Sequence, residues 1–298
     1  MFYHSFHLQY QEPLFRPPSE ADSLILQVTF GCTWNHCAFC EMYQTKAFQV
    51  KKEEDVIREI EAIAAFDPGV RKVFLADGNP MALSTHRLLF ILKAIKKHLP
   101  KVRRVSTYAL PRDILAKTTE ELIMLKTAGL TLLYVGIESG DDEVLKLINK
   151  GETSESTVDG LLKAKAAGMK ISAIILNGVG GKQYSHQHAI HSAKVLNAIQ
   201  PEYTSILVLS FPYGVERYQN RFTGSYIPMT IMDLLIEMQV FIEHTELEAS
   251  IFRSNHASNY LILSGILSKD KATFIEALDQ AIAHPQNAGL RAEWQRGL

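Results

Sequence analysis

The sequence contains few cysteines: three among 298 residues. Three thiols cannot all pair within one chain, and secreted scaffolds built on disulfides normally carry an even, dispersed set. We therefore expect no disulfide framework. All three cysteines fall within residues 31–40, so their role has to be sought in that short stretch.

The sequence also lacks long apolar runs and an excess of charge of one sign. No apolar stretch reaches about 18 residues, the length of a membrane-spanning helix, and residues 1–23 lack the basic and apolar segments of a secretory signal. The 31 basic and 32 acidic residues give a formal net charge of −1. No global field therefore attracts nucleic acid or an anionic membrane. Because a signal segment and long apolar runs are missing, we expect a cytoplasmic protein with no membrane partner.

What the sequence does contain is an alternation of β-rich runs with helical periodicity, which is typical of βα units around a parallel sheet. With 47% hydrophobic residues, the chain can bury a sizeable core. The predicted strands are 24–29, 72–76, 104–108, 132–137, 171–176 and 205–210. The predicted helices are 53–66, 84–99, 119–128, 141–149, 154–167, 188–198, one from about 230, and 270–283, whereas 211–228 reads as a loop.

This pattern predicts an α/β fold, a partial (βα)6 TIM-like barrel with short N-terminal and α-helical C-terminal extensions. The expected division is an N-terminal extension at 1–23, a core at 24–215 and, at 216–298, a C-terminal extension that closes the barrel. Polar and glycine-rich loops follow most of the strands: DGNP at 77–80, ESG at 138–140, NGVGG at 177–181 and FPYG at 211–214. Because such folds bind ligands at the carboxyl ends of their strands, we expect one ligand that spans several of these loops.

The cysteine stretch GCTWNHCAFC follows the first predicted strand and has the spacing CxxxxCxxC. Loop thiolates at this spacing suit a metal centre, and three are one short of a closed four-ligand site. Three readings remain open on the residues alone. These are a chance cluster of small buried residues, a structural zinc with a further ligand, and a four-iron, four-sulfur cluster with one iron left open. His36 is a poor fourth zinc ligand because it adjoins Cys37.

These motifs together resemble the radical S-adenosylmethionine (SAM) superfamily: the cysteine loop, Phe39 before the third cysteine, and the loops after the second and fifth strands. GIESGDDEVLKLINKG at 136–151 is similar to a segment of the subgroup with methylthiotransferases, Elongator catalytic subunits and oxygen-independent coproporphyrinogen oxidases. GCTWNHCAFC and RSNHASNYL resemble a bacterial group within the superfamily. The resemblance spans about 24–213. The superfamily's usual spacing is CxxxCxxC, so this loop has one extra residue.

The resemblance implies that Cys32, Cys37 and Cys40 ligate three irons of a 4Fe-4S cluster, and that the fourth iron binds SAM. An external donor such as flavodoxin or ferredoxin would supply the electron that cleaves SAM to a 5′-deoxyadenosyl radical. The implied cofactor-binding residues are Phe39, Asp77, Gly78, Asn79, Pro80, Glu138, Ser139, Asn177 and Gly178. On the residues alone, 77–80 and 177–180 also fit plain turns, and Glu138 also fits an ion pair with Lys150 or a helix cap.

Substrate recognition is expected in the C-terminal part, where FRSNHASNY concentrates polar side chains at 252–260. Arg253, Asn255 and His256 are the predicted substrate-binding residues, and His256 and Tyr213 the predicted catalytic residues, for instance as a proton donor. A well-hydrogen-bonded structural loop is the alternative. We expect the histidines at 186, 188 and 191 to form a solvated helix start.

The resemblance predicts a radical SAM enzyme that acts on an unidentified small-molecule substrate. No further cysteine is available for an auxiliary cluster, which disfavours methylthiolation. Two alternatives remain: a non-catalytic iron-sulfur or zinc-binding βα-barrel protein, and a tRNA-modifying radical SAM enzyme. The neutral net charge argues against a nucleic-acid partner, although a basic face could form from Lys93, Lys96, Lys97, Lys101, Arg103 and Arg104.

Overall fold

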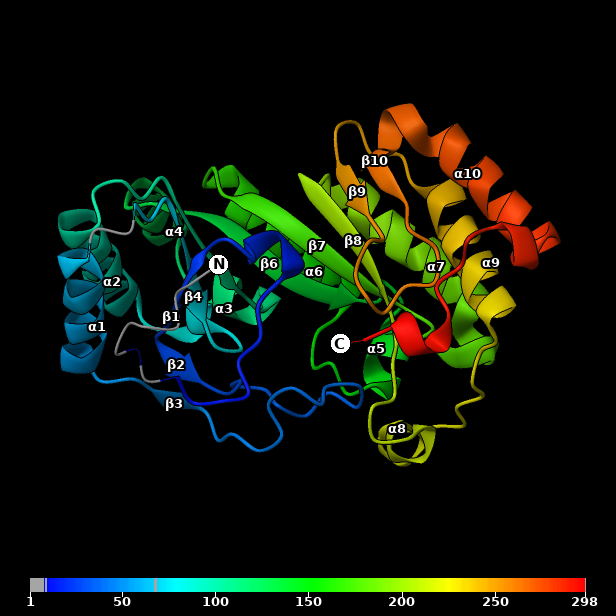
Figure 1. Cartoon of the computed structure of the whole chain (residues 1–298), viewed down its shortest axis with the longest axis horizontal. Helices are drawn as coiled ribbons and strands as arrows, with labels where there is room; N and C mark the ends of the chain where they lie inside the picture. Colours follow the sequence, from blue (N-terminus) through cyan, green and yellow to red (C-terminus); the bar gives the residue numbers. More distant parts are fainter. Residues whose placement is uncertain (1–7, 9, 67–68, 298) are drawn as a thin grey trace. The chain divides into compact units, whose positions relative to one another are not determined.

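The computed structural model describes residues 8, 10–66 and 69–297, and Figure 1 shows its helices and strands. Residues 1–7 and 9 of the expected N-terminal extension lie outside the described residues. The chain divides into two compact units. Unit 1 comprises Met1–Asn35, Cys40–Val135 and Gly160–Ile171, and unit 2 comprises His36–Phe39, Gly136–Asp159 and Ser172–Leu298.

Unit 1 is built on parallel strands. They are β1 (Leu24–Gln27), β4 (Lys72–Ala76), β5 (Arg104–Tyr108) and β6 (Leu130–Glu138), of which the part up to Val135 belongs to this unit. Four consecutive residues of β4 are buried after an exposed Lys72, so both faces of this strand are covered, as a parallel sheet between helices requires. Phe74, Tyr108 and Tyr134 make edge-to-face contacts on these strands, with ring centroids 5.1 to 6.2 Å apart.

The remaining elements of unit 1 are mostly helices. They are α1 (Glu53–Ala65), α2 (Thr85–His98), α3 (Pro111–Leu115), α4 (Thr119–Thr127), the part of α6 (Ser154–Ala166) from Gly160, the short helices η1 (Pro18–Glu20) and η2 (Pro80–Ala82), and the strand pair β2 (Thr29–Phe30) and β3 (Gln49–Val50). Helix α4 starts with the expected capping box: Thr118 Oγ1 accepts from Glu121 N at 3.2 Å, and Glu121 accepts from Thr118 N at 2.8 Å.

Unit 2 continues the same pattern and adds an antiparallel edge. Its strands are β7 (Lys170–Asn177, from Ser172), β8 (Tyr203–Val208), β9 (Ile251–Arg253) and β10 (Ser264–Ile266); β7, β8 and β9 are parallel neighbours and β10 runs antiparallel to β9. Its helices are α5 (Asp142–Leu147), α7 (Gly181–Ile199), α8 (Val215–Arg221), α9 (Ile231–His244), α10 (Leu267–Ala283), η3 (Pro285–Asn287) and η4 (Glu293–Gln295). Helix α9 packs against both α7 and α10 (Figure 1).

The predicted fold class is confirmed. All six predicted strands are present, in the order β1-β4-β5-β6 within unit 1 and β7-β8-β9-β10 within unit 2. Two predictions about the bounds of secondary structure were wrong. The helix expected at 188–198 begins at Gly181, because its first residues are polar and hide the period. The expected loop at 211–228 contains α8, whose Tyr218 packs on Phe222.

Among the described residues, no helix is both long enough and apolar enough to cross a membrane.

Candidate functional site

The first part of the cysteine loop lies in unit 1 and is packed tightly against the turn after β4. Gly78 N donates to Gly31 O at 3.0 Å. A Cβ atom added at Gly78 would lie 2.8 Å from the Cβ of Cys32 and 2.7 Å from Gly31 O, closer than atoms pack. Only glycine therefore allows the two loops to approach this closely. Cys32, Cys37 and Cys40 are not joined in disulfides, and each is partly exposed.

Asp77 lies beneath this contact in a buried ion pair. Its Oδ2 is 2.8 Å from Lys46 Nζ, and both side chains are at most 1% exposed. Gly31 N also donates to this oxygen at 3.3 Å, and Lys46 donates further to the carbonyl oxygens of residues 11 and 13. Burial raises the pKa of Asp77, and the Lys46 ammonium opposes that rise. Asp77 is thus used to hold the loop that carries Cys32.

Asn79 has a similar bracing role in unit 1. Its Oδ1 accepts from Thr33 N at 3.0 Å, and its Nδ2 donates to Thr33 Oγ1 at 2.7 Å and to Asp113 Oδ2 at 2.8 Å. Thr33 follows the first cysteine, so these bonds tie the cysteine loop to α3. Pro80, also predicted here, is buried at the start of η2.

The residues that make this cysteine loop longer than usual are themselves well supported. The guanidinium of Arg112 lies 4.2 Å from the centre of the Trp34 ring, a cation–π contact. Asn35 has a positive φ of 45° and donates through Nδ2 to Tyr43 O at 2.9 Å. The extra length is therefore accommodated by contacts of its own within unit 1.

The second part of the cysteine loop, His36–Phe39, belongs to unit 2. Ala38 is 1% exposed and donates its N–H to Ile148 O at 2.8 Å, just beyond the end of α5. Lys150 Nζ lies 5.6 Å from the centre of the Phe39 ring. Phe39 and the loop around Cys37 are thus fixed on the segment that follows α5.

Lys150 also pairs with Glu138, which ends β6. The two side chains are 3.1 Å apart, Lys150 Nζ to Glu138 Oε1, and Glu138 has a positive φ of 65°. A Cβ added at Gly136 would lie 2.1 Å from Glu138 Oε1, so glycine at 136 makes room for the carboxylate. From the sequence, an ion pair with Lys150 was the alternative to a SAM contact for Glu138, and this ion pair is present.

The turns after β6 and β7 are held from inside unit 2. Ser139 Oγ is 2.8 Å from His188 Nδ1. Gly178 N donates to Glu237 Oε1 at 2.6 Å, while Asn177 Nδ2 donates to Leu234 O at 3.0 Å. These three groups of the turns are therefore directed at α7 and α9.

His188 was expected at a solvated helix start, and that prediction was wrong. His188 is 1% exposed because α7 starts earlier than predicted and turns this position toward the core. The apolar Ala189, Ala193 and Leu196 on the same helix were the available signal. By contrast, the His191 side chain is half exposed and lies 2.6 Å from Asp141 Oδ2.

The predicted substrate residues lie in two places in unit 2. Tyr213 is 67% exposed, and the Arg217 guanidinium lies 5.3 Å from its ring centre. Arg253 ends β9; His256 Nδ1 is 2.8 Å from Ser258 Oγ. The carbonyl oxygens of Asn255 and His256 both accept from Arg291, so the loop is well hydrogen-bonded, as in the alternative interpretation. Burial and the nearby Arg291 lower the pKa of His256.

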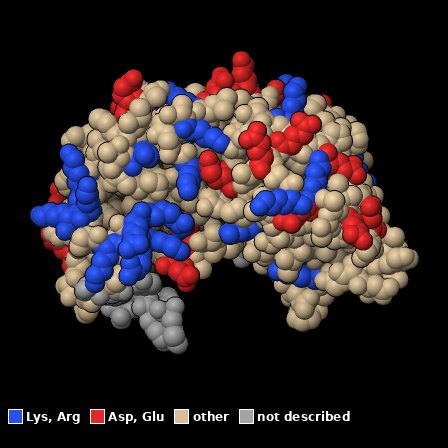
Figure 2. Space-filling view, turned by 90° about the horizontal axis from the view of Figure 1, so that it is seen from above, with Lys and Arg blue, Asp and Glu red and all other residues tan. Residues whose placement is uncertain are grey.

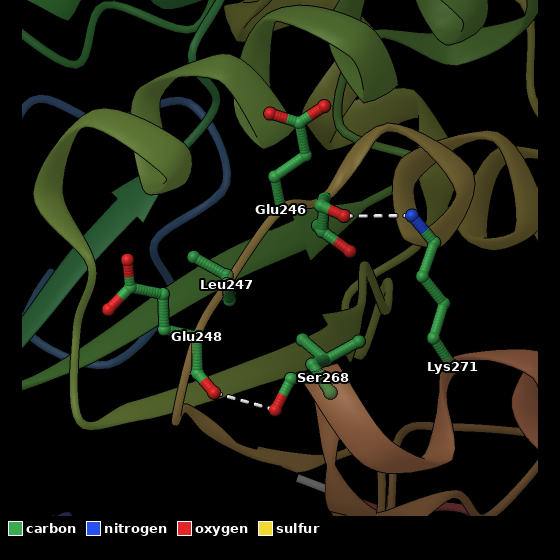
Figure 3. A pocket seen from close by; sticks show the side chains of 7 residues that line it. Glu246, Leu247, Glu248, Ser268 and Lys271 are labelled. Carbon is green, nitrogen blue, oxygen red and sulfur yellow. Dashed lines mark hydrogen bonds between the residues drawn. The ribbon is translucent and has the colours of Figure 1, made fainter.

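A separate surface pocket of about 340 Å³ lies in unit 2 between the segment after α9 and the start of α10 (Figure 3). None of the predicted site residues lines it. Two of its polar side chains donate hydrogen bonds to backbone carbonyl oxygens. Lys271 Nζ donates to Thr245 O at 2.8 Å, and Ser268 Oγ donates to Glu248 O at 2.6 Å. Among the described residues, no three His, Cys, Asp or Glu side chains are gathered as ligands of a single metal ion.

Comparison with known proteins places this arrangement in a family. The model of the radical SAM superfamily matches residues 26–196. The chain is 25% identical over 143 residues to the heme chaperone HemW of Bacillus subtilis, covering 47% of this chain and 38% of that protein. It is 29% identical over 179 residues to a tRNA-2-methylthio-N(6)-dimethylallyladenosine synthase of Alkalilimnicola ehrlichii, covering 56% and 38%.

The structure of coproporphyrinogen III oxidase (HemN) from Escherichia coli, a radical SAM enzyme, is similar in fold. The TM-score is 0.56 at 17% identity, with 74% of this chain and 52% of that chain covered. The chain spans well under half the length of the two curated relatives.

The family model covers more than half of the chain and includes the three cysteines and the turns after β4, β6 and β7. Cysteine thiolates are the ligands that iron-sulfur clusters use, so three cysteines that are not in disulfides fit the group that the family carries. The cofactors are a 4Fe-4S cluster and SAM, which the family cleaves reductively. The chain is an enzyme of the radical SAM superfamily.

Proposed function

We propose that this enzyme uses SAM to generate a 5′-deoxyadenosyl radical that abstracts a hydrogen atom from a small-molecule substrate. The observation that carries the proposal is the cysteine loop, whose three cysteines are not in disulfides and whose first cysteine, Cys32, is packed against Gly78. When bound, a 4Fe-4S cluster with three protein ligands supplies one open iron for SAM and the electron for its cleavage. Cys32, Cys37 and Cys40 are the proposed ligands.

The turns after β4, β6 and β7 are the proposed SAM contacts. Not every polar side chain in them is proposed to bind SAM, because some are engaged within the protein. Asp77 Oδ2 is engaged with Lys46, and the side-chain amide of Asn79 is engaged with Thr33 and Asp113. These two residues would therefore shape the loop, while the backbone at Gly78 and Pro80 approaches the methionine part of SAM. Exclusion of water from this loop would protect a radical from solvent.

Glu138, Ser139, Asn177 and Gly178 are the proposed contacts to the ribose and adenine. Lys150 engages Oε1 of Glu138, and a carboxylate has a second oxygen that can accept from ribose hydroxyls. Gly178 gives its N–H to Glu237, so its contribution to adenine binding would be close packing of a turn without a side chain. Arg253, Asn255, His256 and Tyr213 remain the proposed substrate residues.

The test is anaerobic reconstitution with iron and sulfide, followed by dithionite reduction with SAM and detection of 5′-deoxyadenosine. Replacement of Cys32, Cys37 or Cys40 by Ala should abolish both the cluster and the cleavage, whereas Ser268→Ala at the separate pocket should change neither. SAM should also be cleaved when reduced flavodoxin or ferredoxin is supplied as the electron donor in place of dithionite. A cluster that forms without any cleavage of SAM would favour a non-catalytic iron-sulfur protein, and zinc in place of iron a structural site.

A tRNA substrate is the second candidate, because one of the matched relatives is a tRNA-modifying enzyme by name. Lys93, Lys96, Lys97, Lys101 and Arg103 are exposed in unit 1, but Arg104 pairs with Glu20 at 2.7 Å. Figure 2 shows basic side chains gathered at the left of one face and both signs interspersed elsewhere. Salt-dependent retention on immobilised RNA would support this candidate over a small molecule.

A further inference from the structure

Two buried ionisable side chains of unit 2 have no part in the chemistry proposed above. His188 lies on α7 and Glu237 on α9, and they are 1% and 2% exposed. Burial of such groups is costly unless they are hydrogen-bonded. Helix α9 also lies beyond residue 196, where the match to the family model ends.

Their partners are the two turns proposed to contact SAM. Glu237 Oε1 accepts from Gly178 N at 2.6 Å, and His188 Nδ1 is 2.8 Å from Ser139 Oγ. His188 Nε2 lies 3.6 Å from the same Glu237 oxygen. A single buried chain of polar groups therefore runs from the turn after β6, through α7 and α9, to the turn after β7.

The backbone around both turns is also fixed by neighbouring groups on α7, on α9 and in the segment before α9. Gly140 N donates to Ser192 Oγ at 2.9 Å, and Tyr226 OH donates to Gly178 O at 3.0 Å. Gly178 has a positive φ of 85°, and a Cβ there would lie 2.7 Å from Leu234 Cδ2. Helix α9 thus touches the backbone of this turn directly, so a small shift of α9 moves the turn.

The chemical state of the two groups agrees with a positioning role. Burial raises the pKa of Glu237 to about 7, against the hydrogen bonds from Ser185 and Gly178. Burial lowers the pKa of His188 to about 4, and the nearby Asp141 and His191 act on it in opposite directions. His188 is therefore neutral at neutral pH, which suits a hydrogen-bonded support and not a charged contact to ligand.

We propose that Glu237 and His188 are positioning residues of the SAM site, which hold the turns at Gly178 and Ser139 so that SAM affinity depends on α9. This rests on the proposed function, because those turns are assigned to SAM by it. The consequence is that the C-terminal part, beyond the matched family region, helps to build the cofactor site.

The test measures the Kd for SAM by anaerobic calorimetry on the full chain with its oxidised cluster, a state in which SAM is not consumed. Glu237→Leu removes the acceptor for Gly178 N–H and should raise the Kd about tenfold or more with unchanged iron content. Glu237→Gln keeps an oxygen acceptor and should restore the Kd to within about threefold of wild type. Met238→Ala, at the neighbouring buried position, should lower thermal stability without raising the Kd.

Tyr226→Phe is the mild second variant, since it removes only the hydroxyl that bonds Gly178 O. It should raise the Kd about threefold, and it decides the question if Glu237→Leu does not fold. Equal Kd values for wild type and these variants would overturn the positioning role and leave the proposed function intact. Absence of SAM binding by the reconstituted wild type would overturn both. If Met238→Ala raises the Kd as much as Glu237→Leu does, Glu237 affects SAM binding only through the stability of the protein, and the positioning role is wrong.

Discussion

Replacing His188 or Glu237 should change the pH dependence of stability in opposite directions. Burial raises the pKa of Glu237 from 4.5 to about 7 and lowers the pKa of His188 from 6.5 to about 4. At pH 5.5 both groups are therefore neutral in the native protein. In the unfolded chain, at the same pH, the glutamate is ionised and the histidine is protonated.

The sign follows from which state binds more protons. Between about pH 4.5 and 7, native Glu237 keeps a proton that the unfolded chain has released, so its contribution to stability falls as pH rises. Between about pH 4 and 6.5, unfolded His188 binds a proton that the native state lacks, so its contribution rises with pH. Each full shift corresponds to about 3 kcal/mol, and in wild type the two nearly cancel from about pH 4.5 to 6.5.

Urea unfolding of the apoprotein across this pH range measures the effect. Relative to wild type, the free energy of unfolding of Glu237→Gln should increase by about 2 to 3 kcal/mol from pH 4.5 to 6.5, because only the His188 contribution remains. For His188→Asn it should decrease by a similar amount. Met238→Leu, buried beside Glu237 and without a titrating group, should stay parallel to wild type. If the free energies of unfolding of Glu237→Gln and His188→Asn both stay parallel to that of wild type across this pH range, within about 0.5 kcal/mol, the reasoning is refuted.

Two further predictions concern unit 1. Lys46→Met should lower the free energy of unfolding by about 3 to 5 kcal/mol, because it leaves Asp77 buried without its cation. In the same urea assay, the double variant Lys46→Met with Asp77→Asn should recover part of this loss. Equal stability of the single and the double variant would contradict the prediction. Gly78→Ala should reduce the iron bound after reconstitution, because its Cβ would collide with Cys32, whereas Gly297→Ala, in open space, should bind iron as wild type does.

The sequence was sufficient to predict most of the fold. Buried parallel strands are apolar on both faces, so the runs that became β4 and β7 could be recognised locally. A capping box is likewise local, and the one at Thr118 formed as expected. The two wrong predictions of secondary structure also have local causes. The first turn and a half of α7 is polar and conceals its start, and no apolar periodicity indicates α8.

The candidate site was only partly predictable. The cysteines and the turns stand out by residue type, but the groups that support them do not. Lys46 is 31 positions from Asp77, and Glu237 is 59 positions from Gly178. Such pairs are brought together by the order in which strands and helices pack, which no short motif records. A lone lysine or glutamate in the sequence is most simply read as a solvated residue.

The same observation changes how the motif residues themselves should be understood. Asp77 and Asn79 have the residue types expected of ligand contacts, yet each donates or accepts within its own unit. A carboxylate or amide engaged in this way fixes the backbone of its turn, and the backbone is then the part left to meet a cofactor. Side-chain substitutions at these positions should therefore act on SAM through the shape of the loop. Glycines such as Gly78, where a single methyl group would displace Cys32, should be less tolerant of change than the charged residues beside them.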